Sequence, residues 1–334
     1  MIPLWLILGT ASTVFAWFVS CYEIRQHLAH YSRPDLQMHI VRVLGMVPVY
    51  SSTALLSLFF KNNEKVVLIL DVIRDSYEAY VIYNFLVLLI NYGGGERHLI
   101  HALELQPRME HPFPLTEVLP PMKLGTGFMY FVRSACLQFV FVKPATAVLV
   151  LCTAHRGSQL LRSIVRIAAV LINNMSVTVA LYGLLCFYHA VENVLRPYKP
   201  LPKFLSVKLV IFLTFWQGMV LSLMIKLGIL VDVEGFSAME QASGLQDLLI
   251  CFEMAGAAVM HLFVFSCQEV LDYPDLLGMS DLFSGYTDED KRPILRNFGD
   301  IVDFRDVLFD AKASIYGSCF EREMHEKGPV EPIL

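Results

Sequence analysis

Long apolar runs separated by short polar stretches dominate the hydrophobic pattern of this chain. A helix needs about 20 mostly apolar residues to cross roughly 30 Å of hydrocarbon. Seven runs approach that length, at residues 3–22, 38–60, 77–92, 128–152, 164–189, 205–231 and 246–268. The helix of the third run could begin as early as Val66. The pattern predicts an all-α integral membrane protein, a seven-transmembrane-helix bundle over residues 1–270.

Residues 71–92 are the most polar part of these runs. Four side chains recur there at helical spacings of three, four and seven and form a stripe: Tyr77, Tyr80, Asn84 and Asn91. The stripe either joins helices through interhelical hydrogen bonds or lines a path for a polar or amphipathic solute. We expect the charges at 71–75 to form a lead-in at the outer surface, which leaves Glu78 at membrane depth.

Other polar residues interrupt the later runs. Lys143 lies inside the fourth run beside Pro144, and we expect it to pair with Glu78 or Glu253. Glu253 and His261 are eight positions apart on one side of a helix, which favours a structural hydrogen-bonded pair, with coupling to protons through the histidine as the alternative. The candidate residues of a solute path are Glu78, Asn84, Gln138, Lys143, Gln217, Glu253 and His261.

Two lysines mark the sixth run. Lys208 and Lys226 are eighteen positions apart, or five full turns, so they share one helix face. They either anchor the helix ends by reaching to the membrane surfaces or flank the two mouths of an anion path.

Lysine and arginine concentrate in alternate loops, which in membrane proteins are normally cytoplasmic. The first, third and fifth loops hold Arg25, Arg33, Arg97, Arg108, Lys123, Arg196, Lys199 and Lys203. The sixth loop, at 232–240, is acidic. The bias places the amino terminus outside or in a lumen and residues 271–334 in the cytosol. A surface helix followed by a short span at 66–92 would break this alternation.

Composition supports the membrane assignment. Of 334 residues, 55% are hydrophobic and 17% charged, and the mean hydropathy is +0.53. The net charge of -5 leaves no basic surface for nucleic acid. Seven cysteines lack CxxC spacing, so neither a disulfide framework nor a zinc site is indicated.

The third loop, at residues 93–127, contains three consecutive glycines and five prolines, which exclude one regular helix. His98 and His101 are three positions apart, and His111 follows. Because no acidic or thiol cluster completes a ligand set, we interpret all three as solvated loop histidines and expect no metal site.

The tail at residues 271–334 is acidic and mixed, with an apolar periodicity over 301–316 that predicts a short amphipathic helix. Phe304 and Val307, after Asp303, fit the short acidic-aromatic pattern that autophagy adaptors bind. These two residues are the candidates for contact with a cytosolic partner. Cys267 and Cys319 are candidates for acylation, with plain burial or solvation as the alternative.

Several motifs together resemble one known family. They are YEAYVIYNFL at 77–86, CLQF at 136–139 with KP at 143–144, PKF at 202–204 leading through Lys208 to WQG at 216–218, and CFE at 251–253 with His261. In this order they are similar to the organic solute transporter alpha subunit and transmembrane protein 184 family, which includes plant and fungal vacuolar relatives. The resemblance covers roughly residues 15–270.

The resemblance implies seven spanning helices, an outer or lumenal amino terminus and a cytosolic tail. In that family the animal transporter moves bile acids, conjugated steroids and related organic anions by facilitated diffusion, together with a single-pass beta subunit. A beta-type subunit or a homo-oligomer, in contact with membrane lipids, is therefore expected, in a plasma, endosomal or vacuolar membrane. Many relatives carry clustered cysteines in the third loop, and residues 111–123 here have none.

Two functions remain open. The first is a carrier for amphipathic organic anions that is neither an enzyme nor dependent on a cofactor. No GxxxxGK[ST] phosphate loop is present, so we expect no ATP coupling within the chain. Lys143 is the first candidate for contact with the anion. The alternative is an endosomal or vacuolar scaffold or receptor that acts through its cytosolic tail.

Overall fold

The computed structural model describes residues 4–61, 63–112, 116, 120–156, 158–198, 200–232, 237–272, 297, 299, 301, 307 and 308. The helices in this part of the chain are α1 (Leu4–Ala29), α2 (Pro34–Leu44), α3 (Met46–Phe59), α4 (Glu64–Tyr92), α5 (Glu96–Glu104), α6 (Thr126–Arg156), α7 (Gln159–Leu195), the 3-10 turn η2 (Arg196–Tyr198), α8 (Pro200–Lys226), α9 (Ala238–Val264) and α10 (Cys267–Asp272). Over the same ranges the only strand-like pairing is a single bridge between Met109 and Met122.

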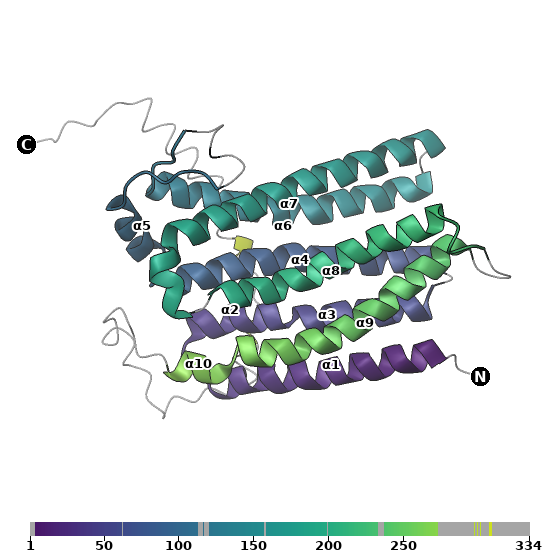
Figure 1. Ribbon diagram of the computed structural model, residues 1–334, viewed down its shortest axis with the longest axis horizontal. Helices are drawn as coiled ribbons and strands as arrows, with labels where there is room; N and C mark the ends of the chain where they lie inside the picture. The colour runs from purple at the N-terminus through teal and green to yellow at the C-terminus, as the bar shows by residue number, and fades with distance from the viewer. Residues whose placement is uncertain are drawn as a thin grey trace, which may run out of the picture.

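The long helices lie side by side with nearly parallel axes (Figure 1). Within the described ranges, five stretches are long and apolar enough to cross a membrane: Leu4–Ala29, Pro34–Phe59, Thr126–Thr153, Gln159–Leu195 and Ala238–Val264. The prediction of a helical membrane protein is therefore confirmed. Helices α4 and α8 lie among these five (Figure 1).

Side-chain caps set the starts of three helices. The Asn63 side chain accepts a hydrogen bond from Val66 N at the start of α4, and Ser158 does the same for Leu161 N at α7. At α9 a complete capping box joins Ser237 and Glu240. These polar caps satisfy N–H groups of the first turn. Each of the three helices therefore begins before the apolar run that predicted it.

The second apolar run is divided into α2 and α3 at Gly45 (Figure 1). The Tyr77 hydroxyl donates to the Arg42 carbonyl oxygen at 2.8 Å and fills the space beside Gly45. A Cβ atom on Gly45 would lie 2.2 Å from that hydroxyl oxygen. The break therefore follows from close packing of α4 against this turn.

The third segment is one continuous helix, α4, which begins at Glu64 and ends at Tyr92. It packs against α2, α3 and α6 and forms the centre of the bundle. The alternative of a surface helix followed by a short span is wrong. Gly94 and Gly95 follow the helix with φ of 86° and 89°, a backbone conformation that glycine adopts without strain.

The bundle has two principal helix pairs on either side of α4. Helices α6 and α7 form an extensive antiparallel hairpin, in which a Cβ on Gly183 would lie 2.9 Å from Ala135 Cβ. Helices α1 and α9 pack along each other on the opposite side, and α8 packs mainly on α9 (Figure 1). Most exposed side chains of α1 and α7 are apolar, as expected of surfaces that face lipid.

The helices also depart from the predicted loops. Lys203, expected in the fifth cytosolic loop, lies in the first turns of α8 and is 2% exposed. Its ammonium group donates to the Tyr198 carbonyl at 3.0 Å. Lys203 is therefore a buried contact of the α7–α8 connection rather than a contact with lipid headgroups.

Five residues beyond 272 are described, and Asn297, Ile301 and Val307 among them contact the bundle. Asn297 donates to the Leu28 carbonyl at 3.2 Å, and the Ile301 carbonyl accepts from Arg42 at 3.0 Å. Ile301 and Val307 are buried, at 8% and 6% exposure. Most of the predicted amphipathic helix at 301–316 lies outside the described residues.

Candidate functional site

A cavity of about 860 Å³ lies between α4, α6, α7 and α8. Eight of its lining residues are polar or charged: Tyr50, Arg74, Asp75, Glu78, Lys143, Asn173, Asn174 and Lys208. The other eight are apolar: Val170, Val177, Leu181, Leu185, Phe204, Leu205, Leu209 and Phe212. The cavity thus combines a charged part with an apolar part.

The charged wall is centred on Lys143. Its Nζ atom lies 3.6 Å from Asp75 Oδ2 and 3.7 Å from Glu78 Oε2. The Tyr50 hydroxyl donates to the same Glu78 oxygen at 3.3 Å. The expected pairing of Lys143 with Glu78 is therefore present, and Asp75 adds a second carboxylate. Opposite charges at this separation offset part of each other's desolvation cost.

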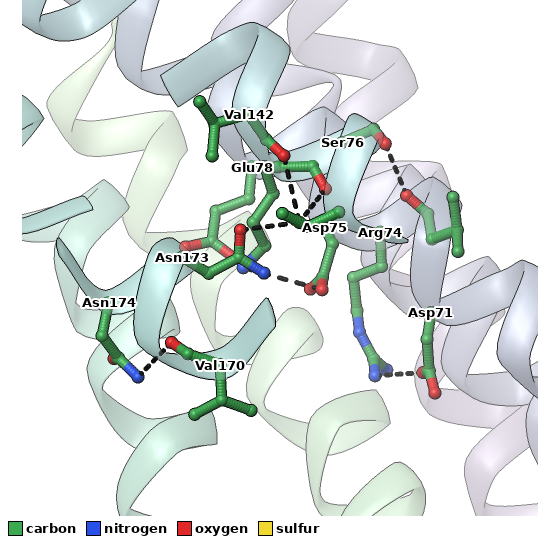
Figure 2. A network of polar contacts seen from close by, with 12 residues as sticks. Asp71, Arg74, Asp75, Ser76, Glu78, Val142, Val170, Asn173 and Asn174 are labelled. Atoms are coloured by element: carbon green, nitrogen blue, oxygen red, sulfur yellow. Dashed lines mark hydrogen bonds and ion pairs between the residues drawn. The ribbon is translucent and has the colours of Figure 1, made fainter. Parts of the chain in front are cut away.

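Asn173 of α7 adds an amide to this wall. Figure 2 shows Asp75 and Glu78 of α4 pointing toward Asn173 across the gap between the helices. The Asn173 side-chain oxygen accepts from the Thr146 hydroxyl at 2.8 Å, which fixes its orientation against α6. Three helices thereby contribute to one polar surface.

Arg74 extends the charged wall toward α9. Its guanidinium lies 2.5 Å from Asp71 Oδ1 and 3.6 Å from Asp247 Oδ1, and the Arg74–Asp71 contact is drawn in Figure 2. The Arg74 side chain is only 15% exposed. Arg74 is thus less solvated than expected of a surface lead-in, whereas the side chains of Asp71 and Asp75 are each 41% exposed, and Arg74 and Asp75 also line the cavity.

The apolar wall continues to the outer surface of the bundle. Val170 and Leu185 of α7 and Leu205 and Phe212 of α8 line the cavity, and they are 46–58% exposed. In the described part of the chain, α7 and α8 contact each other little beyond their connection at η2. The cavity is therefore open along the α7–α8 gap.

Lys208 lies on the α8 side of the cavity, eight residues into the helix rather than at its end. No hydrogen bond or ion pair joins its ammonium group to another residue within the described ranges. Lys226, by contrast, is the exposed last residue of α8 and does not line the cavity. The two lysines therefore differ in environment even though they share a helix face.

Two of the predicted solute-path residues are helix contacts instead. Asn84 is fully buried, and its side-chain oxygen accepts from His39 at 2.9 Å and from Arg42 at 3.2 Å. Gln138 donates to the Ser176 carbonyl at 2.8 Å and accepts from the Ser176 hydroxyl at 2.6 Å. Neither residue lines the cavity.

The remaining predicted residues lie at the packing faces of α9. Gln217 of α8 donates to Glu253 Oε1 and joins the two helices. His261 is 1% exposed, and its ring nitrogens have no hydrogen-bond partner among the described residues. The expected pair of Glu253 and His261 does not form. Instead the His261 ring meets Phe265 edge-on, with centroids 5.4 Å apart.

The three loop histidines divide into two kinds. His98 and His101 are exposed on α5. His111 is 9% exposed, so its interpretation as solvated is wrong. Its Nε2 atom donates to the Pro120 carbonyl at 3.0 Å, which leaves Nδ1 to accept from the Tyr182 hydroxyl. Within the described residues, no group of three or more His, Cys, Asp or Glu side chains could hold a metal ion.

Comparison with known proteins agrees with this architecture. A family profile described as organic solute transporter Ostalpha matches residues 5–270. The chain belongs to the organic solute transporter Ostalpha family. No solved structure matches it. As a member of an Ostalpha family of transporters, the chain is a multi-pass membrane protein that is associated with organic solute transport.

The matched Ostalpha region contains every residue of the cavity but not the tail candidates. Phe304 lies outside the described residues. Val307 is 6% exposed and packs into the main hydrophobic core. Its contact with a cytosolic partner stays a proposal that would require this residue to leave the core.

Four cavity residues are absent from the set predicted from the sequence: Arg74, Asp75, Tyr50 and Asn173. A signal for the first two was present, because residues 71, 74, 75 and 78 share one helix face at spacings of three, four and seven. The apolar run begins only after this face, so the hydrophobic pattern places these charges outside the membrane. No comparable signal marked Tyr50.

Proposed function

We propose that this member of the Ostalpha family carries amphipathic organic anions, such as steroid- or bile-acid-like molecules, across a membrane by facilitated diffusion. The observation that carries the proposal is the cavity, in which a charged wall from α4 and α6 meets an apolar wall from α7 and α8. Such a surface suits a solute with one charged end and an apolar body. The volume of about 860 Å³ lies within the roughly 300–1,000 Å³ of small-molecule sites.

The charges of the cavity indicate where an anion would bind. Lys143 already has Asp75 and Glu78 as neighbours, so an anion at Lys143 must compete with two carboxylates. Lys208 lines the same cavity without a hydrogen bond or close ion pair in the described chain, and it interacts with Glu78 only at longer range. We therefore propose Lys208 as the first contact of the anionic group and Lys143 as the second.

The open α7–α8 gap supports access for the apolar part of the solute. The lining side chains of this gap are also part of the exposed apolar surface of α7 and α8. A solute dissolved in the bilayer would meet an uninterrupted apolar surface up to the charged wall. Because the chain contains no GxxxxGK[ST] phosphate loop, the proposal includes no energy source within it.

The proposal extends to the membrane arrangement. We propose seven crossings, with α2 and α3 counted as one and with α4 and α8 added to the five apolar stretches. Helices α1 and α9 run in the same direction (Figure 1), as the first and seventh of seven alternating crossings must. The charge bias of the loops supports an outer or lumenal amino terminus. A beta-type subunit or a second copy stays a proposed partner.

Uptake into vesicles tests the proposal. Purified protein is reconstituted, and uptake of a labelled steroid sulfate is compared for wild type, Lys208→Ala and Lys226→Ala. Lys226→Ala is the matched control, because it removes the same charge from the same helix outside the cavity. A hydrogen bond to a charged group contributes about 1.5–3 kcal/mol. A loss of about 1.4 kcal/mol of binding free energy raises the dissociation constant tenfold. We expect Lys208→Ala to raise the half-saturating concentration by roughly tenfold or more.

The two variants must be present at equal amounts and with equal thermal stability. Uptake by wild type that does not exceed empty vesicles would contradict the carrier function itself. Uptake by wild type with equal saturation curves for Lys208→Ala and Lys226→Ala would contradict the role of Lys208 while leaving transport in place.

A further inference from the structure

A second group of buried ionisable side chains lies between α1 and α9. Glu23 of α1 is 3% exposed, and His261 of α9 is 1% exposed. None of the residues that line the cavity comes from α1 or α9. The group is therefore separate from the proposed solute site.

The packing of α1 on α9 shows how far along the two helix axes Glu23 and His261 lie. Near one end, a Cβ on Gly9 would lie 3.4 Å from Leu248 Cδ1. Near the other end, His27 Nε2 donates to the Phe265 carbonyl at 2.8 Å. The helices therefore run parallel, with a nearly constant offset. Glu23 precedes His27 by one turn and His261 precedes Phe265 by one turn, so Glu23 and His261 lie at the same level.

Neither group is satisfied within the described part of the chain. Both carboxyl oxygens of Glu23 and both ring nitrogens of His261 lack hydrogen-bond partners, and no salt bridge joins them to each other or to another residue. A buried polar group without a partner costs about 1–3 kcal/mol. An isolated buried carboxylate costs far more and is rarely kept in membrane helices without a function.

The other acidic, basic and histidine side chains that the structure describes on α1, α2 and α9 do not supply a counter-ion to Glu23. Each has its own partner or is exposed: His39 and Arg42 of α2 bond to Asn84, Asp35 pairs with Arg33, Asp247 of α9 pairs with Arg74, Glu253 bonds to Gln217, and Arg25 and Glu240 are exposed. On α1 itself, His27 is bonded through Nε2, and its Nδ1 has no partner in the described chain.

We propose that Glu23 is a proton-binding site, with its carboxyl group held in the protonated form between α1 and α9. The two groups are not hydrogen-bonded in this structure, and a side-chain rotation would let the His261 ring at the same level accept from the carboxyl O–H. The proton comes from water at the end of α1, six residues or roughly 9 Å away, and it returns there when the seam between α1 and α9 opens. The His261 ring stays neutral in the protonated state of the site.

This assignment has a direct thermodynamic consequence. The folded protein holds a proton that an unfolded chain with an ordinary carboxyl group releases above about pH 4.3. Because the folded state then binds more protons than the unfolded state, stability falls as pH rises above that value. Glu23→Gln keeps the shape of the protonated acid and cannot lose a proton, so it removes this contribution.

The test compares three full-length proteins in detergent: wild type, Glu23→Gln and Glu192→Gln. Glu192 is exposed on α7, so the control makes the same chemical change at a hydrated position. Thermal unfolding is followed from about pH 5 to about pH 8. We expect Glu23→Gln to be more stable than wild type, with a difference that grows as pH rises, and Glu192→Gln to follow wild type. Identical pH profiles for Glu23→Gln and wild type would overturn the proposal.

Infrared spectroscopy tests the same site without unfolding. At neutral pH we expect a carbonyl stretch of a protonated carboxylic acid that is lost in Glu23→Gln and kept in Glu192→Gln. The frequency of this band should shift in His261→Phe, because its hydrogen-bond acceptor is gone. Absence of the band in wild type would overturn the proton-binding site, and a band unmoved in His261→Phe would overturn the role of His261.

Discussion

Lys143 of α6 and Glu78 of α4 form an ion pair across the helix interface, with Nζ 3.7 Å from Oε2. Both side chains are largely buried, at 16% and 10% exposure. The pair is shared, since Asp75 Oδ2 lies 3.6 Å from the same ammonium group and the Tyr50 hydroxyl donates to the same carboxylate. The Lys143–Glu78 contact therefore joins three helices at the wall of the cavity.

Loss of one partner should cost more stability than loss of both. Lys143→Met leaves Glu78 as a buried carboxylate without its cation, and breaking a buried pair in this way typically costs about 3–5 kcal/mol. Glu78→Gln added to Lys143→Met should recover most of the loss. Thermal unfolding of both single variants and the double variant measures the coupling. Additive effects of the two changes would contradict a direct pair.

Helix geometry explains which parts of this charged wall could be predicted from the sequence. The pairing of Lys143 with Glu78 was expected because a lysine inside an apolar run needs an acidic partner. Periodicity places residues on a face of one helix but does not say which neighbour that face meets. Asn84 was therefore assigned to a solute path, although it accepts hydrogen bonds from His39 and Arg42 between α2 and α4.

Two further differences have the same origin. The pattern is compatible with Lys208 as a helix-end anchor, because the sixth apolar run begins five residues after the actual start of α8. Glu23 follows the first apolar run, so the sequence alone does not distinguish it from an interfacial charge. Its burial depends on the packing of α9, which is more than two hundred residues away along the chain.

The contact between Gly45 and Tyr77 predicts a non-additive pair of substitutions. Gly45→Ala would place Cβ 2.2 Å from the Tyr77 hydroxyl oxygen, an overpacking that should cost roughly 1–3 kcal/mol. Tyr77→Phe removes that oxygen, so the double variant should be less destabilised than the sum of the single ones. Thermal unfolding in detergent measures each variant.

Gly256→Ala is the control for this experiment, because nothing lies within 4 Å of a Cβ built at that helical position. Alanine there should be neutral or stabilising by roughly 0.5–1 kcal/mol. If Gly45→Ala lowers stability equally in the wild-type and Tyr77→Phe backgrounds, the Tyr77 hydroxyl is not the reason that position 45 requires glycine.

The bond between His111 and Tyr182 predicts that α7 holds the third loop in place. Tyr182→Phe leaves the His111 Nδ1 atom without its donor, and His111→Ala removes the bond to Pro120 as well. Both variants should increase the rate of proteolysis within residues 105–123, with the larger effect for His111→Ala. His98→Ala, at an exposed position of α5, should leave the rate unchanged. Equal cleavage of all three variants would argue against a docked loop.

The side of α7 on which a bulky residue is placed should decide its effect on transport. Val177 lines the cavity, whereas Val179, two positions on, is 38% exposed on another face of the same helix. The indole of Val177→Trp would occupy space needed by the solute. We expect a loss of about 1–3 kcal/mol of binding free energy, which corresponds to roughly a 5- to 150-fold loss of affinity. Val179→Trp adds the same volume on a face directed away from the cavity. Uptake of a steroid sulfate by vesicles should therefore fall for Val177→Trp and persist for Val179→Trp. Similar uptake by both variants would mean that the solute passes elsewhere, because the two proteins differ only in which face of α7 carries the indole.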